Sequence, residues 1–227
     1  MLPSSTVENY LKAIVLQQQH ASGDALVGMG QIAAALGVTP GTATTMVKAL
    51  AEAGLVQYEP YSGVRLTAAG ERLAGLVLRR HRLVELFLVQ VMNLRWDEVH
   101  EEAEKLEHVV SERLIERMDE MLGRPEVDPH GDPIPDADGA IRVRELQTLL
   151  DCPLDTPVTI TRVTDQGAPF LRFIENSHLK PGETIQVEAR DAVADSVRVC
   201  GRGEQRMTIG TRAASKLLVE VLPPQDH

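Results

Sequence analysis

The sequence predicts a mainly α protein with a small β domain at its C-terminal end. Amphipathic helical patterns fill roughly the first half of the 227-residue chain. A stretch rich in Pro, Gly and Asp follows at residues 125–138, and short runs of period-two alternation occupy the rest. A chain of this length can bury one or two cores and has room for three small modules. We expect domains over residues 1–73, 74–140 and 141–227.

The first module has the pattern of a winged helix-turn-helix. Ser5 and Glu8 are spaced as a capping box that opens an amphipathic helix. A second helix is expected over residues 29–38, and a third from its cap at Thr39 to Ala53. Runs at 55–59 and 64–67 then predict a hairpin, the wing. Helix, tight turn, helix is the arrangement that places the second helix in a DNA major groove. A helical bundle with a surface hairpin and no DNA function is the alternative.

Hydroxyl groups and one cation on the third helix suit contacts to phosphates and base edges. The candidate DNA-binding residues are Thr39, Gly41, Thr42, Thr44, Thr45 and Lys48 on this helix, with Tyr61 and Arg65 on the hairpin. The net charge of −10 argues against coating of nucleic acid along the whole surface, but it does not exclude a local basic surface.

The tail is expected to form a small β-barrel. Runs at 158–163, 184–189, 197–199 and 217–221 alternate as short strands do. Cys152 and Cys200 have neither the density of a disulfide scaffold nor the paired spacing of a zinc site. We find no signal peptide and no apolar run of membrane-spanning length, so we expect a cytoplasmic protein without membrane partners.

Residues 100–108 are expected to form one helix with a row of metal ligands. At about 100° per residue, a single face holds His100, Glu104, Glu107 and His108. Two imidazoles and two carboxylates on one face, with no Lys or Arg among them, bind divalent cations well. The alternative is an ordinary solvated acidic helix. A second cluster upstream, His81 and Glu85 one turn apart, favours the metal interpretation.

Three separated motifs, at residues 6–14, 79–85 and 99–108, together resemble the diphtheria toxin repressor family. Its members are metal-dependent transcriptional regulators of iron and manganese uptake. Residues 128–135 resemble that family's linker, and the strand-rich tail resembles its third, SH3-like (FeoA-type) domain. The resemblance implies a homodimer that binds operator double-stranded DNA, a helical dimerisation domain in the middle, and repression as the expected mode. Apolar positions between Leu76 and Leu114 suit a dimer interface, although a larger monomeric core explains them equally well.

The resemblance also implies a primary, activating metal site made of Asn9, Glu104, Glu107 and His108. Iron-type members carry Cys at the position of Glu104, and manganese-type members carry Glu. Oxygen ligands in place of sulfur favour harder ions, so Mn²⁺ is the first choice and Fe²⁺ the second. Asn9 departs from the family, in which this position is usually Asp or Met.

A second site is implied by two overlapping family patterns. His81, Glu85 and His100 match the ancillary site of iron-type repressors, whereas Asp128 and His130 match a Cys and a His that join the Glu85 position in some manganese regulators. Asp165 or Gln166 is the candidate ligand from the third domain. We therefore expect one to two or more ions per protomer.

Two rival functions remain at this point. A metal-dependent hydrolase needs an open coordination position with a base or nucleophile beside it, and the sequence has no HExxH pattern or other suitable partner, so we do not expect an enzyme. A winged-helix regulator that responds to a non-metal ligand is the stronger alternative.

Overall fold

The structure is a computed structural model that describes residues 4–20, 26–142, 144–201, 203 and 205–222. The chain divides into two compact units, each with its own hydrophobic core. Unit 1 comprises Met1–Val84, Glu104–Glu120 and Ile134–Arg142, and unit 2 comprises Glu85–Ala103, Met121–Pro133 and Val143–His227.

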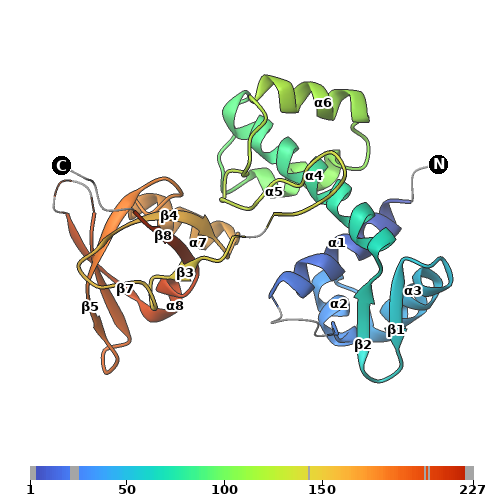
Figure 1. Cartoon of the computed structure of the whole chain (residues 1–227), viewed down its shortest axis with the longest axis horizontal. Helices are drawn as coiled ribbons and strands as arrows, with labels where there is room; N and C mark the ends of the chain where they lie inside the picture. Colours follow the sequence, from blue (N-terminus) through green and yellow to red (C-terminus); the bar gives the residue numbers. More distant parts are fainter. Residues whose placement is uncertain (1–3, 21–25, 143, 202, 204, 223–227) are drawn as a thin grey trace. The chain divides into compact units, whose positions relative to one another are not determined.

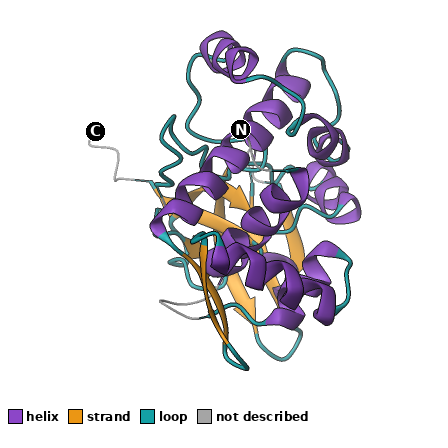
Figure 2. Cartoon of the chain, turned by 90° about the vertical axis from the view of Figure 1, so that its right-hand side faces the viewer, coloured by secondary structure: helices purple, strands orange, loops and turns teal. Residues whose placement is uncertain are grey.

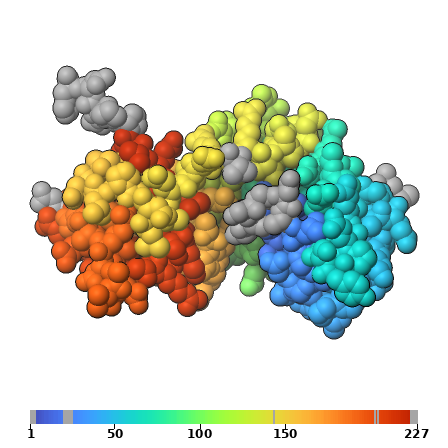
Figure 3. Space-filling view, turned by 60° about the horizontal axis from the view of Figure 1, so that its bottom comes forward, coloured from blue at the N-terminus to red at the C-terminus, as the bar shows by residue number. Residues whose placement is uncertain are grey.

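Unit 1 contains the predicted winged helix. Its elements are α1 (Ser5–His20), α2 (Met29–Leu36), α3 (Pro40–Glu52), β1 (Val56–Glu59) and β2 (Gly63–Leu66). Figure 1 shows α2 and α3 beside the β1–β2 hairpin, and Figure 3 shows these elements packed together in blue to cyan. The turn after α2 is made by Gly37 at φ +63°, and α3 begins where the Thr39 hydroxyl accepts the Thr42 N–H. The helix-turn-helix and the wing are confirmed.

The predicted capping box at the start of α1 is wrong. Ser5 already lies inside the helix, and the Ser4 hydroxyl accepts the Val7 N–H at 3.4 Å instead. Glu8 is turned inward and is 4 % exposed. Its carboxylate binds the Arg80 guanidinium, and this charged bond takes the place of a cap interaction.

Three further helices follow, α4 (Ala68–Gln90), α5 (Val99–Leu106) and α6 (Glu112–Met121). The chain breaks between α4 and α5, where Asn93 has φ +57°. The expectation of one helix over residues 100–108 is wrong at its end, because α5 stops at Leu106. Val109 and Val110 both donate their N–H to the Leu106 carbonyl, and valine is a weaker helix former than alanine or leucine. Glu107 and His108 therefore lie in the turn after the helix.

The apolar residues considered for a dimer interface differ in exposure, and some are half-buried. Leu83, Val84, Leu86 and Leu88 are buried within the chain itself, whereas Val91 and Leu114 are exposed. Much of this apolar surface thus belongs to the monomeric core.

Unit 2 contains an antiparallel sheet of six strands in the order β3-β8-β4-β5-β6-β7, drawn in orange in Figure 2. The strands and helices are β3 (Gln147–Thr148), β4 (Pro157–Val163), α7 (Ala168–Asn176), β5 (Thr184–Asp191), β6 (Ser196–Cys200), β7 (Arg206–Gly210), α8 (Thr211–Ala214) and β8 (Leu217–Val221). All four predicted strands are confirmed. The alternation gave no sign of the two-residue β3 or of β7, in which Ile209 is the one buried residue.

The predicted linker at 125–138 forms no regular helix or strand and is anchored on β4. The Val163 N–H donates to the His130 carbonyl at 2.8 Å. Gly131 has φ +86°, and a Cβ there would lie 1.9 Å from the Thr161 carbonyl oxygen. Only glycine allows this close approach, and it holds the preceding residue, His130, beside β4.

Candidate metal centres and DNA interface

The first cluster of candidate ligands lies in unit 1, where α1 meets the turn after α5. Asn9 Oδ1 is 2.8 Å from His108 Nε2, and Glu107 Oε1 is 3.3 Å from the same nitrogen. Adjacent donor atoms around an octahedral divalent cation, with bonds of about 2.1–2.2 Å, lie about 3 Å apart. Three of the four predicted primary ligands therefore converge at a spacing that fits such an ion.

Glu8 orients the His108 ring. Its Oε2 lies 2.6 Å from His108 Nδ1, and because a carboxylate only accepts, Nδ1 carries the proton. Nε2 then faces Asn9 and Glu107, in the manner of metal-binding histidines whose other nitrogen donates to a carboxylate. Sequence reasoning missed Glu8. The available signal was a polar pair, Glu8 and Lys12, one turn apart on the face of α1 that carries the buried Leu11.

Glu107 is the centre of an ionic network. Its Oε1 is 2.5 Å from Lys12 Nζ, and its Oε2 is 2.5 Å from His81 Nδ1. Lys12 Nζ is also 2.6 Å from Glu104 Oε1, which brings the fourth predicted primary ligand to the cluster. Burial raises the pKa of Glu107, but the hydrogen bond from His81 and the charge of Lys12 together lower it by more. The pKa of Glu107 therefore lies below its ordinary value. This carboxylate is therefore ionised at neutral pH.

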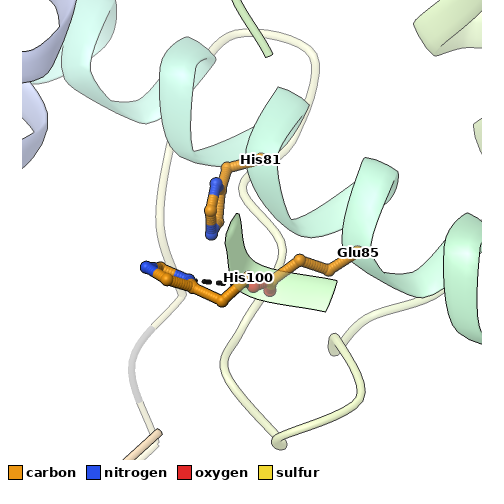
Figure 4. Close-up of side chains that lie close together, drawn as sticks. All are labelled: His81, Glu85 and His100. Carbon is orange, nitrogen blue, oxygen red and sulfur yellow. Dashed lines mark hydrogen bonds and ion pairs between the residues drawn. The ribbon is translucent and has the colours of Figure 1, made fainter. Parts of the chain in front are cut away.

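His81 takes part in two groups of ligand atoms. In one it lies with Glu104 and Glu107. In the other it precedes Glu85 by one turn of α4, and Figure 4 shows both side chains together with His100 from α5. His100 Nδ1 is 3.2 Å from Glu85 Oε1. The sequence had assigned His81 to the second site alone.

A third group, buried in unit 2, consists of Glu85, Asp128 and His130, whose ligand atoms lie within 4.8 Å of one another. His130 Nε2 is 3.0 Å from the Trp96 carbonyl oxygen, which can only accept, so Nε2 carries the proton. Nδ1 consequently offers a lone pair. Within the described part of the chain it has no hydrogen-bond partner, and it lies 3.8 Å from Glu85 Oε2. A fully buried lone pair that faces carboxylate oxygens fits a cation between them.

The candidate ligands from the third domain face other partners. Asp165 Oδ2 binds Lys216, its Oδ1 accepts the Gly167 N–H, and Gln166 Nε2 donates to Asp132 Oδ2 at 2.7 Å. Burial raises the pKa of Asp165, but the hydrogen bonds from Lys216 and from the Gly167 N–H lower it by more, so the pKa lies below its ordinary value. Among the described residues, the three groups of His and carboxylate ligand atoms do not include Asp165.

The candidate DNA-binding residues lie on the solvent-facing side of α3 and on the hairpin. Ala43, Val47 and Leu50 form the buried face of the helix. The opposite face exposes Thr39, Gly41, Thr42, Thr45 and Lys48, with Thr44 half-buried. Tyr61 is fully exposed at the tip of the hairpin with φ +65°, and Arg65 Nε donates to Gln57 at 2.7 Å. This geometry leaves the polar helix face and the wing tip free to meet DNA.

The first helix of the winged domain also contributes to a cluster of candidate His and carboxylate ligands. This combination is typical of metal-responsive DNA-binding regulators. Three family models match the chain in sequence order. They are "Iron dependent repressor, N-terminal DNA binding domain" at residues 3–64, "Iron dependent repressor, metal binding and dimerisation domain" at 67–136, and "FeoA domain" at 147–221. The chain belongs to the diphtheria toxin repressor family of metal-dependent transcriptional repressors.

Individual relatives agree with this family assignment. The iron-dependent repressor IdeR of Mycobacterium leprae is 28% identical over 191 residues, which are 79% of this chain and 82% of the relative. A solved structure described as a manganese-dependent transcriptional repressor in complex with manganese is 38% identical with a TM-score of 0.86, over 95% of this chain and all of the other. The manganese regulator SloR is 33% identical with a TM-score of 0.75, over 98% of this chain and all of the other. These relatives are transcriptional repressors and not enzymes. Among the described residues no helix is long and apolar enough to cross a membrane.

Proposed function

We propose that this protein is a cytoplasmic, homodimeric repressor that binds operator DNA when Mn²⁺, or as second choice Fe²⁺, occupies its primary site. The observation that carries the proposal is the convergence of Asn9, from the first helix of the winged domain, with Glu107 on Nε2 of His108. Relatives named for manganese and for iron support both metals.

The primary ion would be held by Asn9, Glu104, Glu107 and His108. Three oxygen-bearing side chains and one imidazole, without sulfur, suit a hard ion such as Mn²⁺. A bound divalent ion would supply one centre bonded both to α1 and to the segment after α5. Arg80 holds Glu8, Glu8 holds the His108 ring, and Asn9 reaches the same point from α1. These residues would thereby fix the orientation of α1.

Control of DNA binding would follow from that orientation. A dimer presents two copies of α3, which must match half-sites about 34–36 Å apart or a multiple of that distance. Fixing α1 selects the arrangement that fits, and the coupling free energy is the difference in metal affinity between the two arrangements, about 1–3 kcal/mol per site.

We propose a second ion at Glu85, Asp128 and His130, with His81 and His100 as further candidate ligands through their proximity to Glu85. The buried lone pair of His130 Nδ1 supports this position. Asp165 stays a candidate only if it is released from Lys216.

Elemental analysis of the purified protein, followed by operator binding with chelator and with excess Mn²⁺, tests the proposal. The operator is a duplex selected from a random pool in Mn²⁺, and binding is measured by electrophoretic shift at fixed salt. We expect Mn or Fe in the protein and specific binding only with metal. Equal operator affinity in chelator and in Mn²⁺ would contradict the proposal and favour a regulator with a non-metal ligand.

A further inference from the structure

Lys12 is a cation that the chain itself places among the primary ligands. It lies in the middle of α1 and is 7 % exposed. Its Nζ is 2.6 Å from Glu104 Oε1 and 2.5 Å from Glu107 Oε1, so one ammonium bridges both carboxylates. Lysine is almost never buried to this extent without such pairing. Sequence analysis assigned Lys12 no role, since a cation is not a metal ligand.

The bridging position of Lys12 conflicts with a metal ion bound to the same atoms. Hard divalent cations bind carboxylate oxygens at about 2.0–2.6 Å, which is the distance at which the ammonium already contacts both Oε1 atoms. Two cations within a few ångströms repel each other strongly in a site shielded from water. Glu107 cannot simply offer its other oxygen, because Oε2 is held by His81 at 2.5 Å.

We propose that Lys12 is a built-in competitor of the primary ion, which must displace its ammonium from Glu104 and Glu107. This inference rests on the proposed function and assigns a residue that sets the metal threshold of that site. Lys12 and Asn9 share α1, and both contact residues 104–108 in this structure. Displacement of the ammonium would leave α1 attached through Asn9, which lies about one turn of the helix before Lys12.

Removal of the competing charge should strengthen metal binding. Lys12→Gln keeps a polar side chain without charge, Lys12→Arg keeps the charge, and Lys105→Gln removes one positive charge from an exposed position on α5. Each full-length protein is stripped with chelator and titrated with Mn²⁺ by calorimetry. We expect the Kd of Lys12→Gln to fall about tenfold or more, equivalent to about 1.4 kcal/mol. Lys12→Arg and Lys105→Gln should stay within about threefold of the wild type, since an exposed charge is screened.

An unchanged or higher Kd in Lys12→Gln would overturn the competition. Failure of the proposed function gives a different result, because the wild type itself would then take up no Mn²⁺, or Glu107→Gln would bind it as well as the wild type does.

A second measurement on the wild type needs no substitution and covers the case in which Lys12→Gln does not fold. Lysine acetylation by an amine-reactive ester is read out by mass spectrometry with and without saturating Mn²⁺. Displacement from its two carboxylates should raise the labelling of Lys12 severalfold and leave that of Lys105 unchanged. Equal labelling of Lys12 in both conditions would show that the ammonium stays in place and would overturn the proposal.

Discussion

Glu107 is the side chain on which the primary site depends most, because several partners share its two oxygens. Oε1 of Glu107 lies 2.5 Å from Lys12 Nζ and 3.3 Å from His108 Nε2, and Oε2 lies 2.5 Å from His81 Nδ1. The side chain is fully buried. Glu107→Gln keeps its size and removes its charge. We expect this change to remove most of the response of operator binding to Mn²⁺.

The size of the loss follows from Coulomb's law. A unit charge about 2.2 Å from a divalent ion contributes about 4 kcal/mol even at the dielectric constant of water, and each 1.4 kcal/mol or so is a factor of ten. The Mn²⁺ concentration for half-maximal operator binding should therefore rise roughly 100- to 1,000-fold. Glu107→Gln also leaves Lys12 with Glu104 alone, and breaking a buried ion pair costs about 3–5 kcal/mol of folding free energy. Thermal unfolding in chelator should show this second effect.

Glu101→Gln and Glu102→Gln are the matched controls, because both residues are exposed on α5 and carry the same charge. Each variant is titrated with Mn²⁺ against labelled operator at fixed salt. The controls should stay within about threefold of the wild type. Similar losses in all three variants would indicate a general effect of acidic charge and refute the assignment of Glu107 as a ligand.

Three further predictions follow from the two sites and from the loop beside His130. Asn9→Asp adds a carboxylate next to the converging donor atoms, so it should lower the Mn²⁺ concentration needed for operator binding by about tenfold, and an unchanged curve counts against Asn9 as a ligand. His130→Ala should lower the number of ions per protomer found by elemental analysis and leave part of the response of operator binding to Mn²⁺. An unchanged number of ions would show that His130 does not bind the second ion. Burial raises the pKa of Asp97, but the hydrogen bond and the charge of Arg95 lower it by more, so the pKa lies below its ordinary value. The ionised carboxylate therefore stabilises the fold above about pH 4, and this stabilisation is lost as the pH falls through the lowered pKa. The free energy of unfolding in urea should be about 1.5–3 kcal/mol higher for wild type than for Asp97→Asn at pH 7, and this difference should shrink as the pH falls below about 4. A difference that is constant with pH would exclude the ionised pair.

Local signals explain what the sequence predicted well. The α2–α3 turn and the wing were predictable because Gly37, Thr39 and the alternation of the hairpin strands act over a few residues. Candidate ligands were recognisable by residue type and by resemblance. The roles of Glu8 and Lys12 were not, because their partners lie 100 and 92 residues away along the chain. A capping interpretation of Glu8 was the best local explanation, and a long-range ion pair with Arg80 prevailed. The end of α5 was missed for a similar reason, since Glu107 is held by tertiary contacts outside the helix.

Asn9 is the residue proposed to couple the primary ion to the winged domain, and a comparison of metal uptake with DNA binding in Asn9→Ala tests this coupling. Calorimetric titration with Mn²⁺ and operator binding are measured on the same preparation, beside wild type. Because Glu104, Glu107 and His108 remain, the variant should still bind Mn²⁺, with Kd raised about 10- to 100-fold. Operator binding at Mn²⁺ saturation should nevertheless fall by about 5- to 150-fold, the range of a lost coupling of 1–3 kcal/mol or so. If the calorimetric and the operator-binding curves of Asn9→Ala both superimpose on those of the wild type, Asn9 is not a ligand of the primary ion.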